Sequence, residues 1–377
     1  MRKTRLLLAS LLKPVNDTRM YEKMALTLQL LPGADVHVCG FQAPLPGSPT
    51  PVHLHPIFNF KRLSFSRILA QVKFFKLLLR VKPHLLILNT HELLLTGVLY
   101  KIFSGCKLVY DVQENYYLNL TRQNIFPSVI KQLLGFTVRA NEWLSSPFIA
   151  HFILAEKCYA HELPFLQNRY TVIENKYKPA RQHQPEPKPF PIQISEKRIK
   201  LLFSGTISEL NGTFEAIQFC QALQQLQPSV ELTIIGYAAQ PEVYEKLKQQ
   251  IKDKPYIRLI GGNELVPHEQ ILKEISNSDV GLLPYRPNPS TYHCTPTKLF
   301  EYLGNGLPVI VQNNPNWQSI VQEHRAGFSI NFQDFDAKTV LSEILNGRFY
   351  PTGIPAGVFW ETEGEKLLQV ISKLLAK

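Results

Sequence analysis

This 377-residue sequence has little cysteine and no long apolar run. Its five cysteines are scattered and form no Cys-x-x-Cys pair, which argues against a disulfide framework and a zinc site and favours a reducing compartment. No apolar stretch approaches the roughly 20 residues that cross a bilayer, so we expect a cytoplasmic protein without a transmembrane helix. We interpret all five as structural residues that fill space in the fold: Cys39, Cys106, Cys158, Cys220 and Cys294.

The sequence also lacks a complete signal peptide. Basic residues precede the apolar run Leu6–Leu12, but Lys13 and Pro14 end that run early, and no convincing small-residue cleavage site follows. We therefore interpret Leu6–Leu12 as a first buried strand.

Acidic residues are scarce in the first half of the chain. Residues 1–180 contain 22 Lys+Arg and 10 Asp+Glu, a net charge of +12, whereas the remainder contains 19 basic and 20 acidic residues. A basic half can meet nucleic acid, an anionic membrane surface or a phosphorylated ligand. Because no recognisable DNA- or RNA-binding motif accompanies the charge, we expect no nucleic-acid partner.

Apolar runs alternate with helical patterns in both halves, which predicts parallel sheets covered on both faces. The expected strands are 5–12, 35–41, 52–56, 85–89, 107–111 and 170–174 in the first half, and 200–204, 231–235, 257–260, 280–283 and 309–312 in the second. The expected helices are 20–31, 65–82, 93–103, a mostly helical region 127–166, then 213–226, 241–252, 268–277, 297–303 and 361–375.

The organisation predicts an α/β protein of two Rossmann-like doubly wound domains that face a cleft. Residues 178–197 are rich in proline and lack hydrophobic periodicity, so we interpret them as a linker between domains 1–177 and 198–360. A helix in 361–377 is expected to pack back on the N-terminal domain. Ligands of such sheets bind beyond the carboxyl ends of the strands, which makes the loops after strands the candidate sites.

The segment 279–310 carries the strongest such loop. A strand ends at Pro284-Tyr285, and a polar loop leads to a helix that Thr295 or Thr297 can cap and whose free N–H groups make an anion site. Lys298 in the first turn can add charge to a diphosphate. Glu301 lies one turn later, where a carboxylate could accept both hydroxyls of a ribose.

The run from Pro296 to Ile310 resembles the nucleotide-sugar signature of GT-B glycosyltransferases, in particular the glycosyltransferase family 4-like group (glycosyl transferases group 1) of bacterial polysaccharide synthesis. In that family the second Glu of an E-x7-E pattern binds the nucleotide ribose, which corresponds to Glu301. The resemblance covers nearly the whole chain and includes four further segments: 13–23, 109–116, 172–175 and 202–212.

Four positions depart from the family pattern. His293 stands where the family has the first Glu of E-x7-E. Thr206 and Asn211 stand where it has two diphosphate-binding cations, and Gln113 replaces the His of its Asp-Val-His-Glu-Asn stretch. Fewer cations therefore face the diphosphate than in the family.

The resemblance implies a metal-independent, retaining hexosyltransferase that moves a sugar from a nucleotide-diphosphate sugar to a glycan or lipid-linked acceptor, with no cofactor. The residues implied on the donor side are Gly205, Thr206, Asn211, Tyr285, Thr297, Lys298 and Glu301. Asp111, Glu114 and His91 are the acid/base candidates on the acceptor side, although each could instead cap or hydrogen-bond in its loop. Asp17 and Arg19 either contact the acceptor or pair with each other.

The basic segment 60–82 suggests a peripheral contact with the inner membrane face. At helical spacing Lys73, Lys76 and Arg80 share one face, while Ile68, Val72, Phe75 and Leu79 share another, as in helices that lie on anionic bilayers. A domain-core helix with a solvated basic face is the alternative. For the whole chain, a catalytically silent scaffold subunit and a GT-B sugar-nucleotide epimerase remain alternatives to the transferase.

Overall fold

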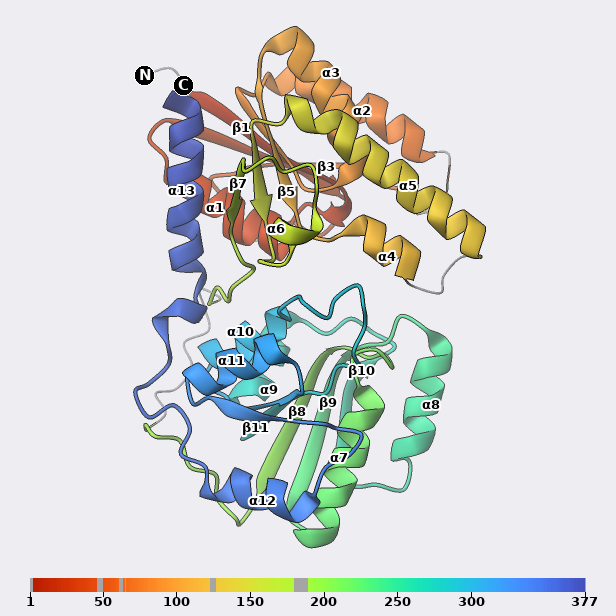
Figure 1. Ribbon diagram of the computed structural model, residues 1–377, viewed down its shortest axis with the longest axis vertical. Coiled ribbons are helices and arrows are strands. Elements are labelled where there is room, and N and C mark those ends of the chain that lie inside the picture. Colours follow the sequence, from red (N-terminus) through yellow and green to blue (C-terminus); the bar gives the residue numbers. More distant parts are fainter. Residues whose placement is uncertain are drawn as a thin grey trace. The chain divides into compact units, whose positions relative to one another are not determined.

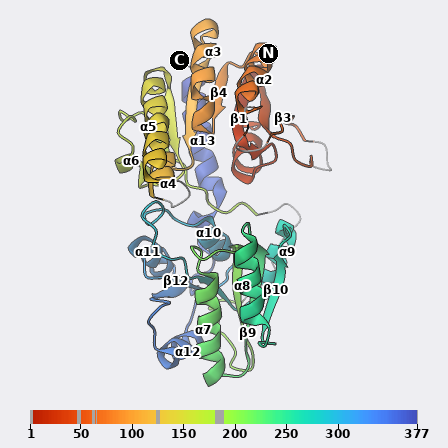
Figure 2. The same cartoon turned by 90° about the vertical axis from the view of Figure 1, so that its right-hand side faces the viewer.

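The computed structural model describes residues 3–45, 50–60, 64, 66–122, 127–179 and 189–376. The chain divides into two compact units, each built on its own sheet (Figures 1 and 2). Unit 1 comprises Met1–Asn175 and Trp360–Lys377, and unit 2 comprises Lys176–Phe359. Every strand pair in the two sheets is parallel, which confirms the predicted pair of Rossmann-like α/β folds.

Unit 1 has a seven-stranded sheet in the order β3-β2-β1-β4-β5-β6-β7. Its strands are β1 (Thr4–Pro14), β2 (Ala34–Phe41), β3 (His53–Phe58), β4 (Leu85–Leu88), β5 (Lys107–Val112), β6 (His151–Leu154) and β7 (Tyr170–Val172). Its helices are η1 (Thr18–Ala25), α1 (Leu26–Leu28), α2 (Ser66–Val81), η2 (His91–Leu93), α3 (Leu94–Ser104), α4 (Tyr116–Arg122), α5 (Ser128–Ser145), η3 (Ser146–Phe148), α6 (Tyr159–Glu162) and α13 (Trp360–Ala376).

Unit 2 has a six-stranded sheet in the order β10-β9-β8-β11-β12-β13. Its strands are β8 (Ile199–Thr206), β9 (Val230–Tyr237), β10 (Ile257–Gly262), β11 (Val280–Leu283), β12 (Val309–Gln312) and β13 (Gly327–Ile330). Its helices are α7 (Thr213–Leu226), α8 (Pro241–Ile251), α9 (His268–Ser276), α10 (Thr297–Gly304), α11 (Pro315–Glu323), α12 (Ala337–Asn346) and η4 (Ala356–Val358).

The elements differ from the sequence prediction in a few places. β6 lies inside 127–166, the region expected to be mostly helical, and β13, α11 and α12 were not expected. The helix expected over 20–31 instead begins at Thr18 with the wide turns of a π-helix and ends at Leu28. Of the expected linker 178–197, residues 180–188 lie outside the described residues.

The C-terminal helix α13 contributes to the core of unit 1. Its buried Trp360, Leu367 and Ile371 pack with apolar side chains of η1, α1 and the sheet. The indole Nε1 of Trp360 donates a hydrogen bond of 2.9 Å to Thr27 Oγ1. In unit 2 one apolar cluster fills both faces of the sheet. Among the described helices, none is both long and apolar enough to cross a bilayer.

Candidate functional site

Two glycines shape the loop between β8 and α7 in unit 2. Gly205 at the end of β8 has a φ of +122°, and Gly212 before α7 has a φ of +74°, both in the region that favours glycine. A Cβ atom on Gly212 would lie 1.9 Å from the carbonyl oxygen of Pro284. The absent side chain therefore lets this loop lie directly against the loop that follows β11.

Asn211 stabilises the same loop from within. Its Nδ2 donates to the carbonyl oxygen of Thr206 (2.9 Å), and its backbone N–H donates to Ser208 Oγ (3.1 Å). Thr213 and Ser208 add two further hydrogen bonds of 3.1 Å between side chain and backbone. Asn211 thus stabilises the loop at a position where the family resemblance led us to expect a cation.

The helix α10 begins beside this loop. The N-cap residue is Pro296, whose side chain makes no capping hydrogen bond. Thr297, one of the two residues expected as a cap, is the exposed first residue of the helix. The N–H groups of the first turn carry the positive partial charge of the helix dipole, so this end of the helix favours anions.

Glu301 lies in α10 between two partners. His268 Nε2 is 2.6 Å from its Oε1, and Lys298 Nζ forms an ion pair with its Oε2. Burial raises the pKa of Glu301, but the charge of Lys298 and the bonds to Lys298 and His268 outweigh it and hold the pKa at about 2. The buried carboxylate is therefore ionised at pH 7.

Lys298 connects this carboxylate to the glycine loop. A Cβ atom on Gly205 would meet the Cε atom of Lys298 at 3.5 Å, so the lysine side chain extends over Gly205. The structure thus brings together Gly205, Lys298 and Glu301, three of the residues predicted on the donor side. His268 was not predicted, although its position at the start of α9, in the loop region after β10, is where such sheets bind ligands.

Tyr285 and Arg286 follow β11. The ring of Tyr285 packs edge-on against Trp317 at 5.9 Å, and burial raises the pKa of its hydroxyl. Arg286 donates to the buried carboxylate of Glu215 and lies 3.9 Å from Glu209. Two acidic residues therefore already neutralise Arg286.

His293 and the single Asp-x-Asp triplet lie apart from these contacts. His293 is exposed, and its ring contacts Tyr292 at 5.2 Å. The triplet is Asp334-Phe335-Asp336, and the carboxylate of Asp336 caps α12 by accepting from the N–H of Thr339 at 2.9 Å. That carboxylate is a helix cap.

In unit 1, Asp111 at the end of β5 lies in a buried ion pair with Arg19. The Nη2 and Nε atoms of Arg19 donate to Asp111 at 2.7 and 3.0 Å, and Arg19 also donates to the carbonyl oxygen of Ile173 at 3.0 Å. Asn89 and Gln113 donate to Asp111 Oδ2 at 2.7 and 2.9 Å. Both carboxylate oxygens are therefore occupied, and Asp111 is fully buried.

Asp17 has a local role in the structure. Its Oδ1 accepts from the backbone N–H groups of Arg19 (3.0 Å) and Met20 (2.9 Å), which caps the first turn of η1. Arg19 thus pairs with Asp111, and its side chain does not pair with Asp17 as one of the two sequence interpretations had it. Burial lowers the pKa of Arg19, but the carboxylate of Asp111 outweighs it and raises the pKa overall.

His91 and Glu114 follow neighbouring strands, β4 and β5. The ring of His91 contacts Tyr116 at 4.5 Å, and burial lowers its pKa, which keeps the imidazole neutral at pH 7. The Glu114 side chain is 43% exposed, lies 3.9 Å from Lys13 and accepts from Asn119 at 3.0 Å. Of the three acid/base candidates, Glu114 is thus the accessible carboxylate.

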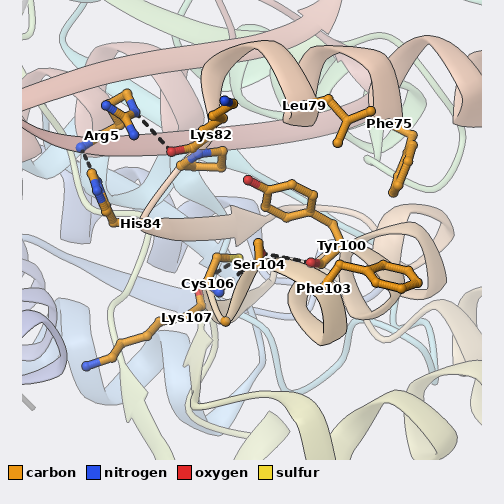
Figure 3. A pocket seen from close by; sticks show the side chains of 12 residues that line it. Arg5, Phe75, Leu79, Lys82, His84, Tyr100, Phe103, Ser104, Cys106 and Lys107 are labelled. Carbon is orange, nitrogen blue, oxygen red and sulfur yellow. Dashed lines mark hydrogen bonds between the residues drawn. The ribbon is translucent and has the colours of Figure 1, made fainter.

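A separate cavity of about 520 Å³ lies between α2 and α3 in unit 1. It opens near the first residues of β1, β4 and β5, at the edge opposite to the carboxyl ends of the strands. Figure 3 shows that one side of it is apolar and the other basic. The labelled side chains are Phe75, Leu79, Tyr100 and Phe103 on the apolar side, with Arg5, Lys82, His84 and Lys107 opposite.

Comparisons with known proteins give one family and one fold. Residues 185–345 match the family model described as glycosyl transferases group 1. No curated protein matches the chain.

Sucrose-phosphate synthase from Thermosynechococcus elongatus is 15% identical with a TM-score of 0.69, over 99% of this chain and 100% of that one. Anabaena HepE in complex with UDP and glucose is 13% identical with a TM-score of 0.64, over 99% and 100%. A putative UDP-N-acetylglucosamine 2-epimerase from Listeria monocytogenes is 11% identical with a TM-score of 0.62, over 99% and 97%.

Proposed function

Since residues 185–345 match the glycosyl transferases group 1 model, we propose that unit 2 binds a nucleotide-diphosphate sugar and that the chain transfers the sugar to a glycan or lipid-linked acceptor. The observation that carries the proposal is the buried, ionised Glu301 between His268 and Lys298. An ionised carboxylate only accepts hydrogen bonds, so it suits two adjacent ribose hydroxyls.

The diphosphate is assigned to the cationic side of the same cluster. Lys298 extends over Gly205, and the first turn of α10 presents N–H groups to an anion. When sugar–diphosphate cleavage begins, negative charge develops on the leaving oxygen, and these groups stabilise it without reorganisation. Retention of anomeric configuration, hexosyl specificity and independence from metal belong to the proposal through the family resemblance.

We assign the acceptor to unit 1. Glu114 is the accessible carboxylate, and neutral His91 can take up a proton at pH 7. Asp111 is assigned a positioning role, because its oxygens already accept from Arg19, Asn89 and Gln113.

The uridine nucleotides are the first donors to test. Anabaena HepE has been described in complex with UDP-glucose, and it shares this fold. A thermal-shift series with UDP, GDP, ADP, CMP and dTDP sugars therefore tests the proposal on the wild type and on Glu301→Gln. Glu231→Gln is a matched control, because Glu231 lies on the same sheet but pairs with Arg198 at the strand's amino end.

A UDP-sugar at about 100 times its dissociation constant should stabilise the wild type and Glu231→Gln by about 2.7 kcal/mol, and Glu301→Gln far less. Equal stabilisation of Glu301→Gln would contradict the assigned site. If none of the five nucleotide classes stabilised the wild type, the result would contradict donor binding itself.

A silent binding subunit is the second candidate, and one observation favours it. Thr206 and Asn211 carry no charge, and Arg286 is already bound by Glu215. UDP release from the bound donor without acceptor separates the candidates, because an active transferase slowly hydrolyses its donor with water in place of the acceptor. Release that Glu114→Gln abolishes supports the transferase, whereas binding without release supports the subunit.

We further propose that unit 1 contacts an anionic membrane, which would bring it to a lipid-linked acceptor. The segment 66–81 is the helix α2, and residues 61–63 and 65 of the predicted segment lie outside the described residues. The helix α2 exposes apolar side chains, and α3 and α5 expose further ones. The cavity in Figure 3 lies between α2 and α3. The exposed apolar side chains are Ile68, Leu69, Val72, Leu79, Leu95, Leu99, Ile102, Phe103, Val129, Ile130, Leu133, Leu134, Phe136, Trp143 and Leu144.

Vesicle sedimentation tests this surface. The wild type should bind vesicles that contain anionic lipid, and Ile102→Ser with Phe103→Ser should weaken binding at least about tenfold, because Phe103 alone is 77% exposed. Leu265→Ser, at an 81% exposed residue of unit 2, is the control that should bind as the wild type does. Binding that depends on neither lipid charge nor Phe103 would contradict the proposal.

A further inference from the structure

Three histidines and one aspartate lie together on the outer strands β2 and β3 of unit 1. In the parallel register His37 pairs with His53, and Cys39 pairs with His55. Side chains two residues apart share a face of a strand, so Asp35 and His37 of β2 lie on the same side as His53 and His55 of β3. The intervening Val36 and Val38 are buried in the apolar core on the opposite face.

The ligand atoms of Asp35, His37 and His53 all lie within 4.8 Å of one another. His53 Nε2 is 3.2 Å and His37 Nε2 is 3.6 Å from Asp35 Oδ1. A tetrahedral zinc ion with bonds of about 2.0–2.1 Å places its ligand atoms about 3.3–3.4 Å apart. The two distances bracket that value, so the Asp35 carboxylate lies at about the ligand spacing from each of the two histidines.

His37 carries a second, independent sign of a missing ligand. Its Nε2 is buried and has no hydrogen-bond partner among the described residues, since the distance to Asp35 is too long for one. Buried polar atoms without a partner are rare and costly, and a metal ion would satisfy this one. The atom points toward the carboxylate of Asp35.

His55 is placed to orient the His37 ring. Its Nε2 is 3.0 Å from His37 Nδ1, and the rings stack at 5.2 Å. If His37 Nδ1–H donates to His55, the lone pair of His37 Nε2 is free to bind a metal, which is the usual arrangement behind metal-bound histidines.

We propose that Asp35, His37 and His53 bind a zinc ion that joins β2 to β3, with His55 as a positioning residue and water as the fourth ligand. Two imidazoles and one carboxylate suit zinc and similar transition metals, whereas magnesium and calcium prefer oxygen ligands throughout. The exposed His53 leaves the fourth position open to solvent. The scattered cysteines argued against zinc in the sequence, and the proposed site uses none of them.

The experiment is a zinc titration of the full-length, tag-free chain after dialysis against a chelator, followed by calorimetry and by the melting temperature. We expect one zinc ion per chain and a higher melting temperature, with no response to magnesium. His53→Gln and Asp35→Asn should each weaken zinc binding more than about tenfold. His53 is 61% exposed, so its substitution should leave folding intact. His161→Gln, at an exposed histidine of α6, is the matched control.

The positioning role of His55 has its own test. His55→Phe should weaken zinc binding about tenfold to a hundredfold while one site remains, and His55→Gln, which can still accept from His37, should restore part of the affinity. Absence of stoichiometric zinc binding in the wild type would overturn the proposal. So would zinc binding that survives both His53→Gln and Asp35→Asn.

Discussion

Glu301 is ionised although it is buried, and the cause is two partner side chains, Lys298 and His268, that come from different parts of the chain. Lys298 lies one helical turn earlier, so the sequence suggests this contact directly. His268 lies 33 positions away, and only the fold brings it within 2.6 Å. No local pattern marks that histidine, which explains why the sequence led to Glu301 and Lys298 but not to His268.

The pKa of Glu301 makes a prediction about stability and pH. Its pKa is 4.5 when unfolded and about 2 when folded, so its contribution to the free energy of unfolding is complete above about pH 4.5 and is lost as the pH falls toward 2. The shift corresponds to about 3 kcal/mol. Urea unfolding from about pH 6 to about pH 2 should show the wild type losing that much more stability than Glu301→Gln. Parallel curves would contradict the assigned ion pair.

The buried pair of Arg19 and Asp111 makes the second prediction. Asp111→Asn leaves the buried guanidinium uncompensated and should cost about 3–5 kcal/mol of stability, measured by urea unfolding. The double variant Arg19→Met with Asp111→Leu should recover most of that loss, because it removes both charges. A stable Asp111→Asn protein without transferase activity would instead return Asp111 to the catalytic candidates.

At the scale of elements, uninterrupted apolar runs with clear ends were predicted well. The strands β11 and β12 have the predicted bounds because Val280–Leu283 and Val309–Gln312 are buried along their whole length. β13 has only intermediate burial and a Gly-Phe-Ser-Ile sequence, and β6 is four residues long between helices, so neither gives a strong local signal. Their strand state comes from pairing with β12 and β5.

The turn between β8 and α7 makes the third prediction. Gly212→Ala places a Cβ atom 1.9 Å from the Pro284 carbonyl oxygen at a φ of +74°, so the loop must move, and we expect a loss of more than about 1 kcal/mol together with weaker donor binding. Gly357→Ala is the matched control, because nothing lies within 4 Å of its added methyl group. Thermal unfolding and UDP-sugar binding of the two variants measure the difference. Equal behaviour would show that the close contact is not needed.

At the scale of the whole molecule, the sequence predicted two Rossmann-like folds because the alternation of strand and helix restarts after residue 197. The sequence did not reveal the order of strands in the sheets. That order depends on the pairing of β1 with β4 and of β8 with β11, which are far apart in the chain. The basic, apolar surface of α2 was visible as a helical pattern. Its continuation onto α3 and α5 was not, because only the packing of helices exposes those side chains together.

The return of α13 to unit 1 makes the fourth prediction. A chain that ends at Phe359 lacks Trp360, Leu367 and Ile371, which are buried in the core of unit 1, while unit 2 keeps its own separate core. Calorimetry of this chain should therefore show the loss or strong lowering of one unfolding transition and little change in another. Full-length Leu367→Ala should lower the free energy of unfolding in the same transition by about 2–5 kcal/mol. Equal effects on both transitions would contradict separate cores.

Because α13 belongs to unit 1 but follows unit 2 in the chain, the order of synthesis and the order of folding are opposed. A ribosome completes unit 2 as one continuous segment, whereas unit 1 waits through the 202 residues after Asn175 for its last helix. At about 5–20 residues per second this wait is roughly 10–40 s. During that time the apolar face that α13 later covers is open to the cell. The unit that begins first is thus finished last, and nascent-chain chaperones are expected to bind unit 1 for longer than unit 2.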